Sequence, residues 1–180
     1  MSAAAAAETV VLVDGDDRET GRAEKLWAHR DGGVRHRAFS VMLRNGNEEW
    51  LLQRRAAGKY HFPGLWSNTC CSHPRPGEGA EEAAHRRLRE ELGVDCPLEE
   101  AFVFEYRATS EATGLTEHEV DHVFTGTWEG EVKVDPEEVG EVRWLDGEAL
   151  EREMAEAPER FTPWFLKLWG ELKTRAAGKH

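Results

Sequence analysis

The sequence predicts an α/β (α+β) fold in which a mixed β-sheet core is flanked by helices. Short strand-like segments are interleaved with a few amphipathic helical segments, which is typical of this class. The length of 180 residues favours a single domain, because a chain of this size buries roughly 70% of its unfolded surface. No internal repeat or long linker divides the chain. We therefore expect one domain over residues 8–180, preceded by a flexible Ala-rich tail at residues 1–7.

The N-terminal part of the sequence predicts strands separated by turns. Turn signals at Asp14-Gly15-Asp16 and Asn45-Gly46-Asn47 bound β-branched or apolar runs. These runs predict strands at residues 9–13, 36–43 and 50–53. The strands at 36–43 and 50–53 are expected to form a hairpin. We expect a short helix at residues 23–29 and a loop, interrupted by Gly and Pro, at residues 56–68.

The clearest predicted element is a helix at residues 79–92. Gly93 is a C-terminal stop signal, and the apolar residues of the helix recur at helical spacing at Ala80, Ala83, Ala84, Leu88 and Leu92. The rest of the chain predicts strands at residues 101–107, 120–128 and 139–144. Two further helices are expected at residues 146–155 and 163–173.

The composition argues against several classes of function. The net charge of −12 is unlike that of most nucleic-acid-binding proteins, although a local basic pocket can still bind an anionic small molecule. No apolar run reaches the ~18 residues of a membrane span. The three cysteines are too few for a disulfide framework. We therefore expect a cytoplasmic monomer that binds a small molecule and neither nucleic acid nor membrane.

A scattered set of metal-capable side chains is the main functional signal. Zinc, manganese and iron prefer imidazole, thiolate and carboxylate ligands, which occur here at His29, His36, Cys71, His73, Glu117 and Glu119. If residues 117–119 form a strand, both carboxylates point to one face. Like charges side by side destabilise a sheet unless a cation lies between them. The segment therefore indicates a metal site.

The predicted helix also carries a sequence that resembles the Nudix box, G-x5-E-x7-R-E-U-x-E-E-x-G-U, where U is aliphatic. The matching residues run from Glu78 and Arg86 to Glu90-Glu91-Leu92-Gly93-Val94. Carboxylates on such a helix and its preceding loop can hold Mg²⁺ against a diphosphate. Two positions depart from the box, since Ser72 replaces its first Gly and Arg87 replaces the Glu that follows Arg. These departures argue against ordinary diphosphate hydrolysis.

A second resemblance covers nearly the whole chain, from about Val10 to Lys173. Residues 66–74, Trp-Ser-Asn-Thr-Cys-Cys-Ser-His-Pro, are similar to the W-x-N-x-x-C-x-H-P signature of type I isopentenyl-diphosphate isomerases of the Nudix superfamily. Later motifs of that family follow in the right order at Tyr106-Arg107-Ala108-Thr109, Glu117-x-Glu119-Val120 and Phe161-Thr162-Pro163-Trp164. The resemblance implies a Nudix-like fold. It also implies interconversion of isopentenyl and dimethylallyl diphosphate through a tertiary carbocation, in isoprenoid biosynthesis.

The same resemblance implies roles for the reacting groups. Glu119 is expected to be both a metal ligand and the proton donor, while Tyr106 hydrogen-bonds beside it or relays the proton. Cys71 is expected to remove the C2 proton from the opposite face of the allyl unit, and the roles exchange in the reverse direction. Trp164 is expected to face the carbocation, an interaction of roughly 2 kcal/mol or more when desolvated, although it could also belong only to the core.

The resemblance further implies two metal ions and a diphosphate subsite. One Zn²⁺ or Mn²⁺ is expected on His29, His36, His73, Glu117 and Glu119. Mg²⁺ is expected to bridge Glu91 and the diphosphate, with help from the backbone carbonyl of Cys71. The cationic side chains expected to bind the diphosphate are Lys25, Arg55, Lys59 and Arg87.

Simpler interpretations compete with several of these assignments. Glu117 and Glu119 could form a solvated strand face, and Cys71 could be a small buried hydrophobe. Arg87 and Glu91 are four residues apart on one helix and could form a surface ion pair. The remaining histidines that receive no metal role in this interpretation are His61, His85, His118 and His122.

Two other functions stay open at the level of the sequence. A Nudix hydrolase of a nucleoside diphosphate derivative needs a water-activating carboxylate but no thiol, so it stays active when thiols are blocked. A non-catalytic metal- or diphosphate-binding protein binds its ligand without turnover. The isomerase, in contrast, loses activity when Cys71 is replaced by Ala or Ser.

Overall fold

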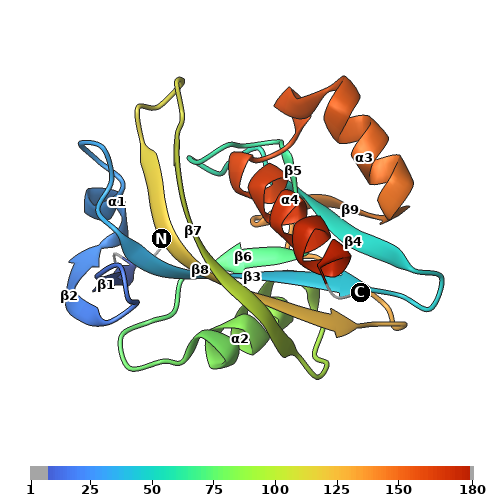
Figure 1. The fold of residues 1–180 in the computed structure, drawn as a ribbon, viewed down its shortest axis with the longest axis horizontal. Coiled ribbons are helices and arrows are strands. Elements are labelled where there is room, and N and C mark those ends of the chain that lie inside the picture. Colours follow the sequence, from blue (N-terminus) through green and yellow to red (C-terminus); the bar gives the residue numbers. More distant parts are fainter. Residues whose placement is uncertain (1–7, 179–180) are drawn as a thin grey trace.

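A nine-stranded mixed sheet organises the chain, with helices on both of its faces (Figure 1). The computed structural model describes residues 8–178. In chain order its elements are β1 (Thr9–Val13), β2 (Glu19–Glu24), α1 (Lys25–Ala28), β3 (His36–Arg44), β4 (Glu49–Arg55), β5 (Trp66–Ser67), β6 (Cys70–Ser72), α2 (Ala80–Leu92), β7 (Glu99–Thr109), β8 (Thr116–Thr127), β9 (Val139–Asp146), α3 (Gly147–Glu156), the 3-10 turn η1 (Pro158–Arg160) and α4 (Pro163–Ala177).

Strand β3 is the centre of the sheet. It pairs antiparallel with β1, β4 and β6 and parallel with β8. Strand β8 in turn forms a long antiparallel hairpin with β7, and β9 pairs with β4. This mixture of parallel and antiparallel strands flanked by helices confirms the fold class that the sequence predicts.

Two apolar cores lie on opposite sides of the sheet because side chains alternate along each strand. On β3, Phe39 and Val41 pack in the core that contains α2, whereas Met42 packs in the core that contains α4. On β8, Phe124 packs in the α2 core and Val123 packs in the α4 core. In Figure 1, α2 accordingly lies on one side of the sheet, and α3 and α4 lie on the other.

Helix α2 confirms the predicted amphipathic helix. Its buried apolar residues face the sheet, and Gly93 ends it in the left-handed conformation, at φ 62°. Glu91 is buried on the same helix, at 4% exposure. The helix therefore presents one carboxylate to the interior next to β6.

Some sequence predictions are wrong in detail. The helix expected at residues 23–29 is only the single turn of α1, because residues 19–24 form β2. Strand β2 is mostly exposed and polar, so it lacks the alternation that reveals a strand. The loop expected at residues 56–68 ends in β5, and the short β6 follows it. Strand β7 extends beyond its predicted range at both ends, and β8 begins four residues earlier than predicted.

Two predictions concern the ends of the chain and its relation to membranes. The flexible tail expected at residues 1–7 lies outside the described residues. No helix within residues 8–178 is long and apolar enough to span a membrane.

Candidate active site

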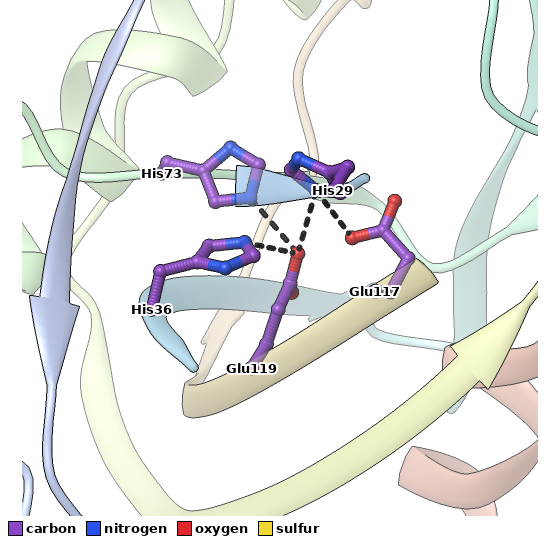
Figure 2. A group of neighbouring side chains, drawn as sticks. All are labelled: His29, His36, His73, Glu117 and Glu119. Carbon is purple, nitrogen blue, oxygen red and sulfur yellow. Dashed lines mark hydrogen bonds and ion pairs between the residues drawn. The ribbon is translucent and has the colours of Figure 1, made fainter. Parts of the chain in front are cut away.

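Three histidines and two glutamates form a buried cluster at one end of the β3–β8 pair (Figure 2). They are His29, His36, His73, Glu117 and Glu119, and one potential ligand atom from each lies within 4.8 Å of all the others. The structure therefore brings together all the residues that the sequence predicts for the zinc or manganese site. The alternative of a solvated strand face is wrong for the two glutamates, since both are 5% exposed.

The sheet register explains how residues far apart in the chain meet. Glu119 lies opposite His36 in the parallel β3–β8 ladder. Glu117 is two residues away on β8, so its carboxylate points to the same face. The backbone N–H of Thr116 donates to the carbonyl of His29 at 2.8 Å, which joins the segment after α1 to the start of β8. His73 follows β6, which pairs with β3.

Hydrogen bonds aim the imidazole rings at the carboxylates. His29 Nδ1 contacts the carbonyl of Lys25 at 2.5 Å, and His36 Nδ1 contacts the carbonyl of Val34 at 2.7 Å. A carbonyl only accepts, so Nδ1 carries the proton when the ring is neutral and Nε2 keeps a lone pair. Nε2 of His29 lies 3.1 Å from Glu117 Oε2, and Nε2 of His36 lies 3.2 Å from Glu119 Oε1.

His73 completes the cluster, with Nε2 at 2.9 Å from Glu119 Oε1. Three ring nitrogens and two carboxylates converging in a buried space form a donor set suited to Zn²⁺ or Mn²⁺. The residues present thus fit the metal ion that the sequence predicts.

The titration of the cluster follows from burial and from its own charges. Burial disfavours a charged His29 ring, but hydrogen bonds and the charges of Glu117 and Glu119 raise its pKa to about 10. Burial and the charge of Glu119 raise the pKa of Glu117. Against the effect of burial, the hydrogen bond from Glu117 and the surrounding histidines hold the pKa of Glu119 well below its usual range. At neutral pH these shifts favour an ionised Glu119 beside a His29 ring that is protonated on both nitrogens and positively charged.

The predicted catalytic residues surround the same cavity. Its lining includes Cys71, Tyr106, Glu119 and Trp164. The Tyr106 hydroxyl donates to Glu119 Oε2 at 2.5 Å, and burial raises the pKa of Tyr106 well above its usual value. Trp164 is only 3% exposed, and its indole N–H donates to Asn68 Oδ1 at 3.2 Å. Trp164 therefore both packs in the core and borders the cavity.

The Cys71 thiol is held in its protonated form. Burial raises its pKa to about 12, Arg55 opposes that shift, and the carboxylates of Glu91, Glu119 and Asp121 add to it. Cys70, its neighbour in β6, is fully buried and points its thiol at Glu91 Oε2, at 2.8 Å. Strand alternation thus separates the two cysteines, and only Cys71 lines the cavity.

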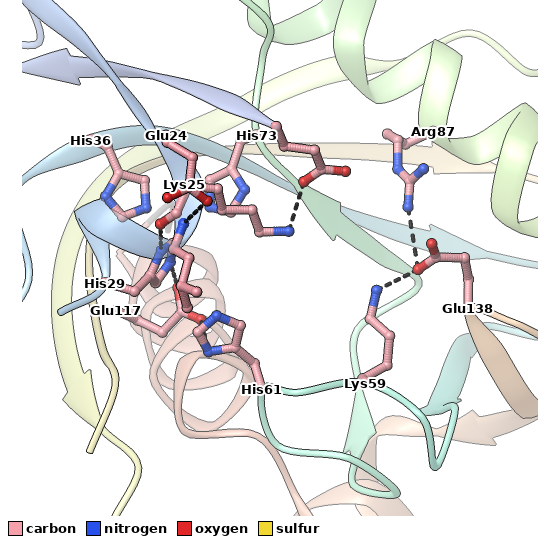
Figure 3. Close-up of polar contacts among 12 residues, drawn as sticks. Glu24, Lys25, His29, His36, Lys59, His61, His73, Arg87, Glu117 and Glu138 are labelled. Atoms are coloured by element: carbon pink, nitrogen blue, oxygen red, sulfur yellow. Dashed lines mark hydrogen bonds and ion pairs between the residues drawn. The ribbon is translucent and has the colours of Figure 1, made fainter. Parts of the chain in front are cut away.

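The four cationic side chains that the sequence predicts to bind the diphosphate line the cavity beside these groups: Lys25, Arg55, Lys59 and Arg87. Three of them contact carboxylates of the protein (Figure 3). Lys25 Nζ is 2.8 Å from Glu8 Oε2. Lys59 pairs with Glu138, and Arg87 Nη2 lies 3.4 Å from the same Glu138 Oε2. Arg55 instead donates to the carbonyl of His61 and lies over the Trp164 ring, at 5.2 Å from its centroid.

Glu91 occupies a different position from the five-residue cluster. Arg87 Nη2 is 3.0 Å from Glu91 Oε1, so the ion pair considered as an alternative is present. The pair is not a surface pair, because both side chains are largely buried. Glu91 does not line the cavity in this structure. The Mg²⁺ site on Glu91 and the Cys71 carbonyl therefore stays a prediction.

One site residue was missed by the sequence interpretation. His61 is 4% exposed, lines the cavity, and has its ring 4.7 Å from that of His29, centroid to centroid. Its sequence signal was weak, since it stands in a loop and outside the matched motifs. The other histidines without a metal role contact carboxylates away from the cluster, namely His85 with Asp95, His118 with Glu105, and His122 with Asp17 and Glu100.

Comparison with known proteins first defines the class. Residues 34–165 match the NUDIX domain family. The fold is similar to the crystal structure of DR0079 from Deinococcus radiodurans, with a TM-score of 0.75 at 23% identity over 91% of this chain and 98% of that chain. It is also similar to a MutT protein from Methanosarcina mazei Go1, with a TM-score of 0.63 at 22% identity over 81% and 96%. These likenesses show the fold alone, and the family match makes the chain a NUDIX-domain protein.

More similar relatives define the particular family. The chain is 53% identical over 160 residues to the isopentenyl-diphosphate Delta-isomerase of Cereibacter sphaeroides, which covers 87% of this chain and 88% of that protein. It is 49% identical over 157 residues to isopentenyl-diphosphate Delta-isomerase 2 of Aromatoleum aromaticum, covering 87% and 82%. The chain belongs to the isopentenyl-diphosphate Delta-isomerase family, which confirms the resemblance read from its motifs.

Proposed function

We propose that the protein interconverts isopentenyl diphosphate and dimethylallyl diphosphate by adding a proton at C4 and removing one at C2. The observation that carries this proposal is a single cavity lined both by Cys71, Tyr106, Glu119 and Trp164 and by the four cationic side chains. The alkene is not activated, so its protonation needs a strong acid in a site that excludes water. The Tyr106 hydroxyl, hydrogen-bonded to Glu119, places a proton in a buried setting of this kind.

The cationic side chains orient the substrate. Guanidinium and ammonium groups bind phosphate oxygens, so the cations that line the cavity hold the diphosphate there, namely Lys25, Arg55, Lys59 and Arg87. Three of these groups contact Glu8 or Glu138 in the structure. A bound diphosphate therefore competes with these carboxylates for the same cations.

The proton for C4 comes from the Glu119 side of the cavity. Because the pKa of Glu119 is lowered and that of Tyr106 is raised well above its usual value, the proton between the two groups resides on the Tyr106 hydroxyl. Tyr106 donates its hydroxyl hydrogen bond to Glu119 Oε2. We assign Tyr106 to deliver a proton to, or through, the Glu119 carboxylate, and protonation at C4 leaves the positive charge at C3.

Cys71 removes the C2 proton, which moves the double bond to its new position. In the structure Cys71 is a thiol, and Arg55 is the neighbour that lowers the pKa against the effect of burial. The thiol form is ready to protonate dimethylallyl diphosphate in the reverse direction. In the forward direction the thiolate acts as the base, and the positive charge of Arg55 is the interaction that favours the thiolate.

Trp164 and the metal cluster complete the proposed site. The Trp164 ring already accommodates one cation, since Arg55 lies over it, and its π system stabilises the tertiary carbocation in the same manner. A Zn²⁺ or Mn²⁺ ion on the five-residue cluster, when bound, supplies positive charge that keeps the Glu117 and Glu119 carboxylates together. No observation favours the hydrolase alternative, because Arg87 replaces a box glutamate and contacts Glu91.

Proton NMR in D₂O tests this proposal directly. Purified protein is incubated with isopentenyl diphosphate and Mg²⁺ beside the variants Cys71→Ala and Cys96→Ala. We expect dimethylallyl diphosphate with incorporated deuterium from the wild type and from Cys96→Ala, because Cys96 lies in the α2 core. Cys71→Ala is expected to give no product. Unchanged substrate with the wild-type protein contradicts the proposal.

A further inference from the structure

His61 has a buried ring whose two nitrogens both lack a hydrogen-bond partner among the described residues. A buried polar atom without a partner costs free energy, so such groups are few and each needs an explanation. Most of the other cavity side chains, in contrast, have polar partners. The orphaned ring therefore indicates a function at this position rather than a packing role alone.

The ring points at the outer side of the metal cluster (Figure 3). His61 Nδ1 lies 3.4 Å from Glu117 Oε1. The other oxygen of the same carboxylate, Oε2, lies 3.1 Å from His29 Nε2 inside the cluster. Glu117 is thus placed between an inner histidine and an outer one. His61 itself is not among the residues whose ligand atoms all lie within 4.8 Å of one another.

The backbone around His61 restricts where this ring can lie. The Arg55 guanidinium donates twice to the His61 carbonyl, at 3.1 and 3.0 Å. Phe62, the next residue, has a positive φ of 43° although it is not glycine, and its ring packs edge-on against Trp164. Strained backbone of this kind persists where the surrounding structure requires it, often at functional sites. The loop therefore holds His61 toward Glu117 while its neighbour contacts Trp164.

We propose that His61 is a positioning residue of the metal site, acting through Glu117. A small rotation of the ring would let Nδ1–H donate to Glu117 Oε1, 3.4 Å away, which leaves Oε2 directed at the space between the three histidines. A hydrogen bond to the free oxygen of a ligating carboxylate fixes its orientation and raises metal affinity. This inference rests on the five-residue metal site of the proposed function and adds a residue to it. The same residue also links that site to Arg55 through its backbone carbonyl.

Metal affinity in three variants tests the proposal without reference to turnover. Affinity for Zn²⁺ is measured by competition with a chromophoric chelator, and the ligand set is monitored by the absorption spectrum of bound Co²⁺. We expect His61→Ala to weaken binding by about 10- to 100-fold with an unchanged number of nitrogen ligands. His61→Asn places an amide N–H near the position of Nδ1 and should retain most of the affinity. His61→Gln places it near Nε2 and should resemble His61→Ala.

Controls separate this role from a general effect of losing a histidine and from direct ligation. His85→Ala removes a partly exposed imidazole that contacts Asp95 away from the cavity, and it should bind metal like the wild type. Circular dichroism verifies that each variant is folded, and if His61→Ala does not fold, the predicted loss of affinity in His61→Gln relative to His61→Asn serves as the test. Equal affinity in wild type and His61→Ala overturns the inference. Loss of a nitrogen ligand from the Co²⁺ spectrum also overturns it, because His61 is then a direct ligand.

The outcome also distinguishes this inference from the metal site on which it rests. If the wild-type protein binds no metal at micromolar concentration, both the five-residue site and the role of His61 are wrong. If the wild type binds tightly and His61→Ala binds equally well, only the role of His61 is wrong. Retention of affinity in His61→Gln but not in His61→Asn contradicts the assignment of Nδ1 as the working nitrogen.

Discussion

Tyr106 and Glu119 are direct cross-strand partners in the β7–β8 hairpin, and the Tyr106 hydroxyl donates to Glu119 Oε2 at 2.5 Å. The opposite edge of β8 places His36 against the same Glu119. One carboxylate is therefore held by a phenol from one neighbouring strand and an imidazole from the other. This position makes Glu119 the point where the metal cluster meets the substrate cavity.

Replacing Tyr106 with Phe tests whether the phenol takes part in proton transfer. The change removes only the hydroxyl and keeps the ring that stacks with Phe104. We expect kcat to fall by about 10²-fold or more, the usual contribution of a positioned acid or base, while KM changes little. Dimethylallyl diphosphate formation is followed by NMR. A kcat close to that of the wild type shows that Glu119 receives its proton elsewhere.

The raised pKa of Cys71 predicts slow alkylation at neutral pH. Because the thiolate is the reactive form and burial raises the pKa of Cys71 to about 12, the reaction rate should increase about tenfold per pH unit between pH 7 and 10. Iodoacetamide labelling followed by mass spectrometry measures the rate, and the Cys71→Ala variant gives the background from Cys70 and Cys96. Fast labelling that is already independent of pH above pH 8 contradicts the raised pKa.

Metal binding should release protons and strengthen as the pH rises. The pKa of His29 is raised to about 10, so its ring is protonated in the metal-free protein at neutral pH. A ligating imidazole must be neutral, and below pH 10 each proton lost on binding raises the apparent affinity up to about tenfold per pH unit. Calorimetry at pH 6.5 and 7.5 in buffers of different ionisation enthalpy measures this release. An affinity that falls with increasing pH contradicts the assignment.

The chemical groups of the site were predictable, whereas their electrostatic partners were not. The motifs around Cys71 and Glu119 identify the cluster because residue types and the two-residue spacing of a strand face are local properties of the sequence. The ion pairs of Lys25 with Glu8 and of Lys59 with Glu138 join residues 17 and 79 positions apart. Such pairings depend on how loops pack, and no local pattern specifies them.

The same limit explains the errors in the fold. Helix α2 was predictable because its apolar stripe and the left-handed Gly93 are local signals. Strand β2 was not, because it is held by backbone pairing to β1 while its side chains are mostly exposed. His61 was missed for a related reason. Its function in the structure comes from Glu117, which is remote in sequence, and from the backbone bend at Phe62.

Glu138 should reduce the affinity of the cavity for diphosphate. It contacts both Lys59 and Arg87, so it neutralises part of the charge that binds phosphate. We expect Glu138→Gln to bind inorganic diphosphate about 2- to 5-fold more tightly, as for a partly exposed ion pair worth up to about 1 kcal/mol. Isothermal titration calorimetry measures the change, and Glu141→Gln, which affects the exposed pair with Arg54, is the matched control. Weaker binding shows instead that Glu138 orients the two cations.

Gly33 should be essential to the contact between the His29 segment and β8. Its φ of +75° disfavours any other residue, and an added Cβ would lie 2.9 Å from the Thr116 carbonyl oxygen. Thr116 also donates its N–H to the His29 carbonyl and precedes Glu117. Displacement of the Thr116 backbone would therefore separate His29 from Glu117, both of which belong to the metal cluster. We expect Gly33→Ala to lower the free energy of unfolding by about 1–3 kcal/mol and to weaken Zn²⁺ binding.

Urea denaturation and chelator competition measure both effects of Gly33→Ala, with Gly15→Ala as the control. An added Cβ at Gly15 meets nothing within 4 Å and Gly15 has no positive φ, so its stability should stay within about 0.5 kcal/mol of the wild type. Loss of stability without loss of metal affinity means that the Thr116 backbone moves while the Glu117 side chain keeps its position. A Gly33→Ala protein as stable as Gly15→Ala contradicts the close approach of the two backbones.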